Sequence, residues 1–412
     1  MSSRILLILI ALGITSAVLM AGCVQQPPGP STPTPAPGSS GQVSLLYTQG
    51  VGPMPVLLQS AQIDGYIAWQ PYVEIANASG IGKVAAYSPE LPPAGRWTNH
   101  PTNVLVARKD FVARSPELAS ALAALTLLSS RYITENPDRA AAITADWLVG
   151  GAPFTFGTTS VPSGPVLQRA FSTVRFTTDP SADWQEGVDG FVTAGSELGY
   201  LSGPLGNASP AARATMLYDF GPYEAASRQV ASGAIATPPR ATRAVSLGYL
   251  MAVDHAALFV AVRDWQHFND TYGIALRPRD TARARPDVCD LVVNGVQVAE
   301  VRLVEGSAGP ALMQAAATDG IQVSFVGVPP AIAAIDGNNL IAILCPVDTE
   351  GSGLVVATSA PVTDWDSFAA WARDRSTAGR PLRIAAPGKG SIQDVMLRVA
   401  LNSSGIAVTE TG

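Results

Sequence analysis

The 412-residue sequence is poor in the residue types that most catalytic and metal sites need. It has three cysteines and only three histidines, His100, His255 and His267, which is too few for a disulfide framework or a metal cluster. It also lacks G-x-S-x-G, H-E-x-x-H and an acid pair on an obvious face. We therefore predict no catalytic residue, metal or cofactor. Cys289 and Cys345 stand in strand-like contexts and are interpreted as buried thiols, with a disulfide as the alternative.

Positive charge is scarce as well. The formal net charge is −6 and the pI is near 5.1, which leaves no electrostatic footprint for nucleic acid. The only lysines are Lys83, Lys109 and Lys389. Beyond the N-terminal run, no apolar stretch approaches membrane-spanning length. The 47% hydrophobic content still supplies a large core, and the length favours two lobes or two domains.

The N-terminus has the pattern of a lipoprotein signal. Arg4 precedes the apolar run Ile5–Met20, and small residues lead to Cys23, which predicts a signal peptide over residues 1–22 and lipid attachment at Cys23. An ordinary signal peptide with a coincidental cysteine is the alternative. Residues 23–42 are rich in Pro, Ser and Thr without an apolar period, so they are expected to form a tether. The protein is therefore expected on the extracytoplasmic face of the cell membrane.

From Val245 onward, short β-branched runs alternate with helical patterns, which favours α/β lobes with largely parallel sheets. Earlier in the chain, Ser115 and Ser181 begin helices with apolar stripes. Residues 236–244 lack periodicity and look like a connector. The expected strands are Ile63–Trp69, Asn103–Ala107, Val245–Tyr249, Val288–Val293, Val298–Val304, Ile321–Val326, Leu340–Leu344, Gly353–Ala357 and Leu382–Ala386, and the later helices are Ala256–Phe268, Ala308–Ala317 and Trp365–Arg375.

The sharpest candidate site is the loop Gly388–Ser391. It follows an expected strand and precedes a helix that begins at Ser391, so its backbone N–H groups and the positive helix end face one point. Lys389 adds a positive charge between two glycines. The loop therefore predicts a cradle for an anion or a polar ligand. A plain capping box between Ser391 and Asp394 is the alternative.

Four other positions fall in loops at strand ends. His255 lies in the first turn of a helix for which Asp254 is expected to be the N-cap, and a structural role for the histidine is as well supported as a ligand contact. The Val328–Pro329 turn follows a strand, although helix entry alone explains its prolines. Ser352 lies in a turn of small residues, and Trp69–Gln70 ends a strand, where the indole either packs a lobe or covers a ligand.

Taken together, these loops resemble the solute-binding proteins of the nitrate/sulfonate/taurine type of ABC importer, a family that includes binders of thiamine-pyrimidine precursors. The resemblance implies a type-II periplasmic binding protein fold, with two α/β lobes, a crossover hinge and a ligand cleft. It implies a small polar or anionic solute, an ABC permease as membrane partner, and a monomer. The segments that carry it are Leu247–Tyr249 with Asp254–His255, Gly327–Ile332, Glu350–Val356, Pro387–Ser391 and Gln62–Tyr72, and the positions expected to line the cleft are His255, Val328, Pro329, Ser352, Gly388, Lys389, Gly390, Ser391, Trp69 and Gln70.

The order of these segments departs from the family, whose first strand corresponds here to Val245. A circular permutation would explain this, with Gly412 joined to Gln42 and Gly405–Val408 running on towards Val43–Leu46. A fragment of a tandem pair is the alternative. In the permuted arrangement, lobe 1 opens with residues 245–348 and closes with residues 101–235. The first part of lobe 2 is 349–412 and its second part is 43–100. The connector is 236–244.

Two functions of another class remain open. The first is an enzyme of the related pyrimidine-synthase type, with His255 as reactive group. The second is a surface sensor or a degenerate module that binds nothing. If the chain is a solute-binding protein, its closure is expected to use hinges near Val347–Gly353 and His100–Val104.

Overall fold

The computed structural model describes residues 41–411, so the predicted signal peptide, Cys23 and the tether up to residue 40 lie outside the described residues. The predicted tether is two residues too long, because Gly41 and Gln42 belong to a strand. That strand is part of a six-stranded sheet in the order β17 (Ile406–Thr411), β1 (Gly41–Tyr47), β16 (Leu382–Ala386), β2 (Gly65–Trp69), β15 (Ser352–Ala357) and β3 (Gly82–Tyr87). The first four strands are parallel to one another, and β15 is antiparallel to both β2 and β3.

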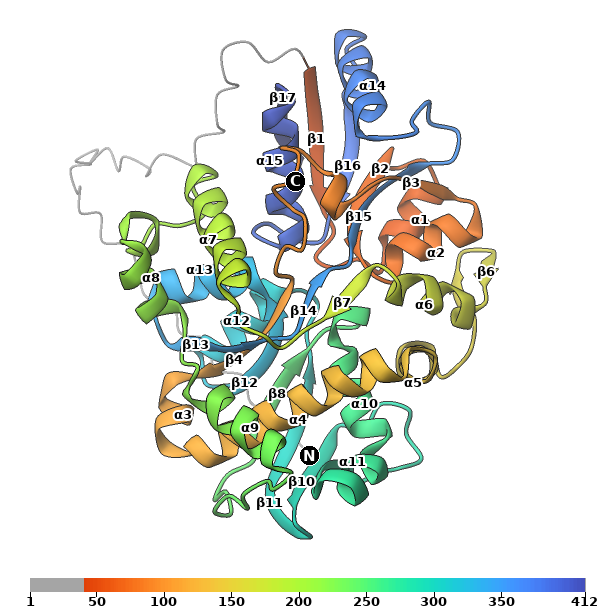
Figure 1. Cartoon of the computed structure of the whole chain (residues 1–412). Helices are drawn as coiled ribbons and strands as arrows, with labels where there is room; N and C mark the ends of the chain where they lie inside the picture. Colours follow the sequence, from red (N-terminus) through yellow and green to blue (C-terminus); the bar gives the residue numbers. More distant parts are fainter. Residues whose placement is uncertain (1–40, 412) are drawn as a thin grey trace, which may run out of the picture. The chain divides into compact units, whose positions relative to one another are not determined.

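A second sheet has seven strands and is separate from the first (Figure 1). Its centre is parallel, since β8 pairs in parallel with β11 and β12, and the remaining pairs are antiparallel. We call the two halves of the molecule the six-stranded lobe and the seven-stranded lobe. The order in the second sheet is β13 (Ile341–Pro346), β4 (Asn103–Arg108), β12 (Val323–Gly327), β8 (Val245–Tyr249), β11 (Val296–Glu305), β10 (Val288–Val293) and β9 (Ile274–Pro278).

Helices cover both sheets, and two short strand pairs complete the fold. In the six-stranded lobe the helices are α1 (Met54–Gln59), α2 (Tyr72–Ser79), α14 (Trp365–Thr377) and α15 (Ile392–Ser403). Those of the seven-stranded lobe and its margins are α3 (Lys109–Arg114), α4 (Pro116–Glu135), α5 (Pro137–Val149), α6 (Ser163–Phe171), α7 (Ala182–Glu197), α8 (Pro210–Leu217), α9 (Gly221–Ser232), α10 (Ala256–Arg263), α11 (Trp265–Tyr272), α12 (Gly309–Ala317) and α13 (Val328–Asn338). The short pairs are β14 (Asp348–Glu350) with β7 (Val174–Phe176), and β5 (Phe154–Phe156) with β6 (Thr159–Val161).

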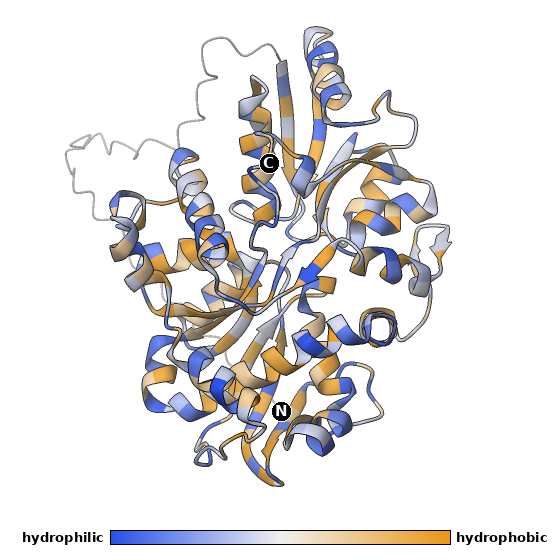
Figure 2. Cartoon of the chain, viewed as in Figure 1, coloured by the Kyte–Doolittle hydropathy of each residue, from blue (hydrophilic) through white to orange (hydrophobic). Residues whose placement is uncertain are grey.

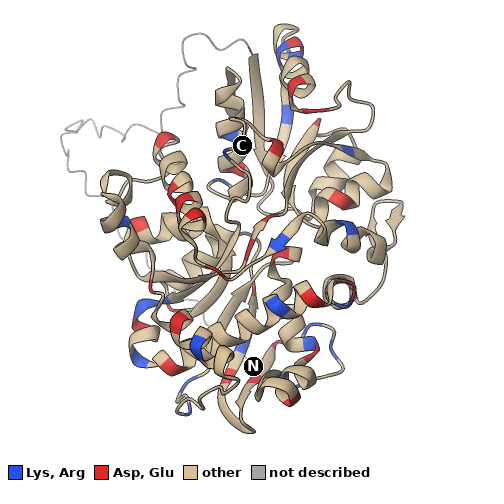
Figure 3. Ribbon diagram, in the orientation of Figure 1, with Lys and Arg blue, Asp and Glu red and all other residues tan. Residues whose placement is uncertain are grey.

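Local sequence explains where several elements begin. Helix α4 has Pro116 at its first position, where a missing N–H costs no hydrogen bond. Helix α7 begins after Ser181, whose hydroxyl oxygen accepts a hydrogen bond from Trp184 N. The strands are rich in hydrophobic residues, and most of their residues are uncharged, so charged side chains concentrate on helices and loops (Figures 2 and 3). Burial of these strands between helices supplies the core.

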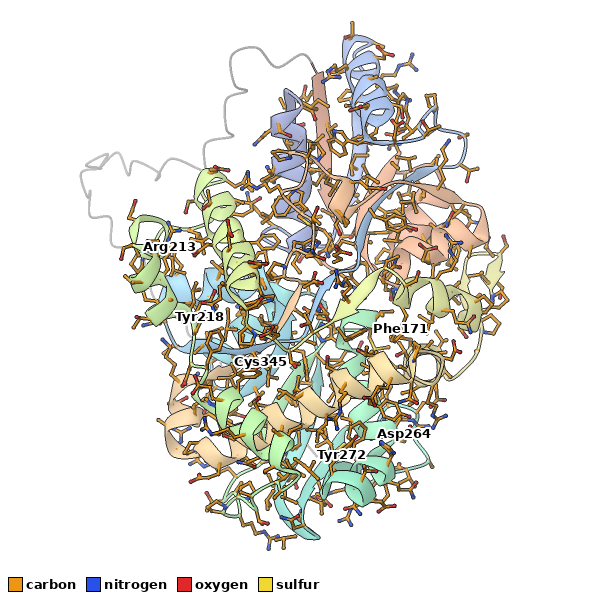
Figure 4. The ribbon with its side chains drawn as sticks, in the orientation of Figure 1. Phe171, Arg213, Tyr218, Asp264, Tyr272 and Cys345 are labelled. Atoms are coloured by element: carbon orange, nitrogen blue, oxygen red, sulfur yellow. The ribbon has the colours of Figure 1, made fainter. Side chains whose placement is uncertain are left out.

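Several sequence predictions are confirmed to the residue. Val245–Tyr249, Val288–Val293 and Leu382–Ala386 are strands with those bounds. The single helix expected over Ala256–Phe268 is wrong, since it is divided into α10 and α11 at Asp264. The Asp264 carboxylate, labelled in Figure 4, accepts hydrogen bonds from Arg139 and from the Tyr132 hydroxyl, which ties the break to α4 and α5.

The two ends of the described chain lie side by side, although not in the way a simple join requires. Strands β1 and β17 are parallel neighbours, with Gln42 opposite Ala407 and Leu46 opposite Thr411. Residues 406–411 and 41–46 thus form two neighbouring strands of the six-stranded sheet. Thr411 lies level with Leu46, about four residues of strand or roughly 13 Å along the sheet from Gln42, so a connection between the two ends would have to run back over that length. Gly412 itself lies outside the described residues.

Two further expectations concern the cysteines and the membrane. Cys289 and Cys345 are both buried free thiols, so the disulfide alternative is not realised; Cys345, labelled in Figure 4, lies in β13. Burial raises the pKa of Cys289 to about 12, so this thiol stays protonated at neutral pH. No helix between residues 41 and 411 is long and apolar enough to cross a bilayer.

Candidate functional site

Two crossover segments connect the lobes and pair with each other. Thr102 N donates to Asp348 O (3.1 Å) and Glu350 N donates to His100 O (3.1 Å), so residues 100–102 and 348–350 form a short antiparallel ribbon. Strand β7 adds a third member by pairing with β14. Both segments match the regions in which hinges are expected from the sequence. We therefore call residues 100–102 and 348–350 together with β7 the hinge ribbon.

Loops from both lobes meet beside the crossovers. Val253 N, in the loop after β8, donates to Gln70 O (3.0 Å), and Gln70 N donates to Gly351 O (3.0 Å). These bonds link the loop after β2, the loop after β8 and the turn before β15. We call the region formed by residues 69–70, 253–255 and 348–352 the junction. Its side chains come from both sheets and from one crossover.

Gly351 leaves room for a carboxylate of the junction. Its φ is +81°, and a Cβ built on it would lie 2.7 Å from Asp254 Oδ1 and 2.8 Å from Val174 Cγ2. Asp254 therefore packs directly over the Gly351 backbone. A side chain at position 351 would be strained in its backbone and would also displace this carboxylate.

His255 is neutral and fixed in one tautomer. It is buried, and burial lowers its pKa to about 3. Leu250 N donates to His255 Nδ1 (3.3 Å), so Nδ1 is the unprotonated nitrogen and Nε2 carries the hydrogen. His255 Nε2 is buried and has no hydrogen-bond partner in the described chain. The Nε2–H group of His255 is thus a buried hydrogen-bond donor without an acceptor in the described chain.

Asp254 and Asp348 are buried carboxylates with unsatisfied oxygens. Asp348 Oδ1 accepts from Asn103 N (3.0 Å), whereas Asp348 Oδ2 and Asp254 Oδ1 have no partner among residues 41–411. Burial raises the pKa of both groups well above the usual range, and the charge of Asp348 raises that of Asp254 further. The expected N-cap role of Asp254 is wrong, because no side chain caps α10.

Trp69 and Gln70 differ in whether the polar groups of their side chains have hydrogen-bond partners. Trp69 is 6% exposed, and its Nε1 has no acceptor in the described chain. The Gln70 amide is engaged at both ends, since Nε2 donates to Thr173 Oγ1 (3.0 Å) and Oε1 accepts from Glu74 N (3.3 Å). The indole N–H is therefore a buried donor without a partner in the described chain, while Gln70 organises the start of α2.

Ser352 belongs to the junction, and the predicted helix-entry residues lie next to it. Ser352 is paired with Trp69 across β15 and β2, and its hydroxyl oxygen accepts from Gln393 Nε2 (2.9 Å). Val328 and Pro329 begin α13 and are buried, and Val328 N donates to Thr102 O (2.9 Å) in the crossover. The first turn of α13 is thus tied to the hinge ribbon. Gln393, which no sequence pattern indicates, reaches Ser352 from α15.

The predicted cradle at Gly388–Ser391 is filled by the protein itself. Gly390 N donates to Asp394 Oδ2 (2.9 Å), and Ser391 Oγ accepts from Asp394 N (3.2 Å) as the N-cap of α15. Ser391 N donates to Gly388 O (3.1 Å), which closes the loop on itself. An anion placed here would meet the Asp394 carboxylate. The polar groups of the loop are therefore bonded within the protein, whereas several of those in the junction are not.

Lys389 points away from the junction. Its ammonium is paired with both oxygens of Glu410 (2.8 and 3.1 Å), and its side chain is 54% exposed. With Gly390, Tyr200 and Met313 it lines a separate groove of about 500 Å³ between α12, α13 and the loop. The structure thus brings Trp69, Gln70, His255 and Ser352 into one junction and leaves Lys389 on its outside.

Comparison with known proteins agrees with this architecture. A model of the NMT1-like family matches residues 35–149 and 239–411, which is more than half of the chain. The chain belongs to the NMT1-like family. No curated protein and no solved structure matches it.

Membership of the NMT1-like family confirms the predicted resemblance to binding proteins of the nitrate/sulfonate/taurine type and the two-lobe α/β fold. The family is one of solute-binding proteins of the ABC-importer type. In this NMT1-like chain, the unmatched residues 150–238 include β7, which joins the hinge ribbon, and α7, which packs against α13 and α15. Parts of the hinge are thus built from sequence outside the family match.

Proposed function

We propose that the protein is a lipid-anchored, extracytoplasmic solute-binding protein that captures a small polar molecule at the junction and delivers it to an ABC permease. The observation that carries the proposal is a set of buried polar atoms without partners at the meeting point of the lobes: Trp69 Nε1, Asp254 Oδ1, His255 Nε2 and Asp348 Oδ2. Buried polar groups are normally hydrogen-bonded. A bound solute would supply the missing partners.

The remaining cleft residues take supporting roles in this proposal. Ser352, Val328 and Pro329 shape the wall of the site, and Gln70 orders the loop that carries Trp69. The Gly388–Ser391 loop holds the start of α15 in place, so that Gln393 can reach Ser352. Because its N–H groups are bonded to Asp394, the loop does not favour a simple anion as the solute.

Capture without turnover is the main test of the proposal. We expect protein purified under native conditions to retain a small molecule, identifiable by native mass spectrometry. Returning that compound to the stripped protein at a hundredfold excess over its Kd is expected to stabilise the fold by about 2.7 kcal/mol. Recovery of the compound unchanged after incubation separates binding from the alternative of a pyrimidine-synthase-like enzyme. The absence of any retained or added solute that stabilises the protein would favour the degenerate module.

The anchor has its own test. We expect Cys23→Ala to abolish incorporation of labelled fatty acid and to release the protein from the membrane fraction, because lipid attachment needs the thiol at this position. Cys289→Ala is the matched control, since this thiol is buried in β10. Continued membrane attachment of the Cys23→Ala protein would contradict the lipid-anchor prediction.

A further inference from the structure

Asp254 and Asp348 have no cationic partner within the protein. Between residues 41 and 411, no lysine or arginine nitrogen lies within 4.0 Å of either carboxylate. Both side chains are nevertheless almost fully buried, at 2% and 0% exposed. Removing a carboxylate from water without a compensating charge or full hydrogen bonding is unfavourable.

Elsewhere the same fold satisfies its buried carboxylates. Asp336 accepts from Gly203 N (2.6 Å) and from Leu205 N (2.8 Å), so both of its oxygens have partners. Asp394 accepts from Tyr47, Tyr200, Gly390 N and Arg398. Asp254 and Asp348 are exceptions to this pattern, and both lie in the junction. Their incomplete bonding therefore points to a group that is supplied from outside the chain.

The groups around the two carboxylates limit what that group can be. Asp254 lies directly over Gly351, three residues after Asp348 in the same crossover, so the two carboxylates share one region. Among residues 41–411 no set of three or more His, Cys, Asp or Glu is arranged to hold a metal ion. The other unpartnered atoms, Trp69 Nε1 and His255 Nε2, are N–H donors and would repel a metal ion. The acceptors of the site are thus the carboxylates, and a ligand has to bring hydrogens to them.

We propose that Asp254 and Asp348 bind a positively charged nitrogen group of the solute, such as an ammonium, amidinium or guanidinium, while the Trp69 and His255 N–H groups bind an acceptor elsewhere on the same molecule. The inference rests on the proposed function and deepens it by naming the solute class. Charge-assisted hydrogen bonds to carboxylates are stronger than neutral ones, so this pair would dominate the choice of solute. The two carboxylates are specificity residues that carry no catalytic task.

Isosteric variants test the inference with a defined panel. Agmatine and cytosine supply cationic or donor-rich N–H groups, and uracil, sulfate and ethanesulfonate are neutral or anionic counterparts. We expect at least one member of the first group, and none of the second, to raise the Tm of the wild-type protein. Asp254→Asn and Asp348→Asn are each expected to weaken that binding about 10- to 100-fold, the loss typical of a charged hydrogen bond.

A ligand-free measurement distinguishes a binding role from a structural one. Without solute, Asp254→Asn is expected to leave the Tm unchanged or to raise it, because the amide is uncharged and ends the unfavourable proximity of two buried acids. Asp336→Asn is the matched control: it alters a carboxylate whose oxygens are both bonded, so it is expected to lower the Tm and leave probe binding unchanged.

The outcomes separate failure of the inference from failure of the function. Stabilisation by anionic or neutral members that persists in both Asn variants would overturn the cation assignment and leave solute binding standing. A lower Tm for ligand-free Asp254→Asn would likewise overturn it, because the carboxylate would then be structural. Wild-type protein that retains no solute and responds to no panel member would overturn both proposals.

Discussion

At the scale of single residues, His100 shows how burial in the crossover fixes a charge state. Its ring is buried, Nδ1 lies 3.3 Å from Pro101 O, and burial lowers its pKa to about 4. An unfolded chain takes up a proton near pH 6.5, before the folded protein does. The stability that neutral His100 contributes is therefore complete above pH 6.5 and is lost as the pH falls from 6.5 to 4.

This shift predicts an acid-sensitive hinge. Between pH 7 and pH 4, we expect His100 to account for about 3 kcal/mol of lost unfolding free energy, measured by urea titration across the range. In His100→Gln this part of the slope is expected to disappear. His267→Gln is the control, since it replaces an exposed histidine outside the crossover. Equal slopes for wild type and His100→Gln would contradict the assignment.

Gly351 permits a second test at this scale. Gly351→Ala is expected to cost at least about 2 kcal/mol of unfolding free energy and to weaken solute binding, because the new Cβ meets Asp254 and Val174. Gly379→Ala isolates the contact: Gly379 has a similar φ of +72°, and no atom lies within 4 Å of a Cβ built on it. We expect this control to show only the backbone cost of about 1 kcal/mol, with binding intact. Equal losses in the two variants would show that the contact with Asp254 contributes nothing.

Not all of the candidate site can be predicted from local sequence. Trp69, His255 and Ser352 each follow or precede a recognisable strand, so their arrival at one edge follows from ordinary α/β topology. The sequence pattern assigns Asp254 to a helix cap and gives no sign of Asp348. Their significance depends on missing hydrogen bonds in a region built from segments hundreds of residues apart, which no local pattern records. Gln393 escapes prediction for the same reason.

At the scale of elements, prediction succeeds where local pattern and burial agree. Strands β8, β10 and β16 are short and largely buried, and their bounds match those expected from the sequence. The break between α10 and α11 depends on Arg139 and Tyr132, which lie more than 120 residues away from Asp264. The start of β1 is not predicted, because Gly41 and Gln42 continue the polar tether in composition and are recruited by β17.

The segment after α7 forms a bond between lobes that can be tested against a bond within one lobe. Tyr200 OH donates to Asp394 Oδ2 (2.6 Å) from the segment after α7, and Tyr47 OH donates to Asp394 Oδ1 (2.8 Å) from β1. Each Tyr→Phe variant loses one hydrogen bond to the same carboxylate, and Tyr47→Phe also loses the bond that its hydroxyl accepts from Arg398 (2.6 Å). Both are expected to lose about 1 to 2 kcal/mol of unfolding free energy.

Solute release is expected to separate the two variants. Tyr200→Phe removes a contact between the segment after α7 and α15 of the six-stranded lobe, and α7 itself packs on α13. The variant is therefore expected to speed solute dissociation several-fold in stopped-flow measurements. Tyr47→Phe acts within the six-stranded lobe and is expected to leave that rate unchanged. A rate that rises equally in both would show that Asp394, rather than the contact between lobes, sets release.

At the scale of the whole molecule, each lobe is assembled from two distant parts of the chain. Residues 41–87 and 352–411 build the six-stranded sheet, and residues 103–108 and 245–346 build the seven-stranded one. Each crossover is therefore a passage between sheets, and the ribbon of residues 100–102 and 348–350 is where lobe movement is transmitted. Circular permutation remains a prediction. The parallel pairing of β1 and β17 requires that a family-like connection between them be a crossover rather than a single continuous strand.

The two lobes touch where Gly327 approaches Ile392. Gly327, at the end of β12, belongs to the seven-stranded lobe, and a Cβ built on it would lie 2.9 Å from Ile392 Cδ1 at the start of α15. The φ of Gly327 is −62°, so alanine fits its backbone and only the contact between lobes resists it.

Gly327→Ala is therefore expected to hold the lobes apart, lowering solute affinity about tenfold with little change in ligand-free Tm. Small-angle scattering is expected to show a solute-saturated variant that stays larger than the saturated wild type. Because the clash involves both Cδ1 and Cγ1 of Ile392 (2.9 and 3.0 Å), which Ile392→Ala removes, Gly327→Ala/Ile392→Ala is expected to regain most of the affinity, whereas Ile392→Ala alone loses little. Failure of the double variant to recover would place the effect outside this contact.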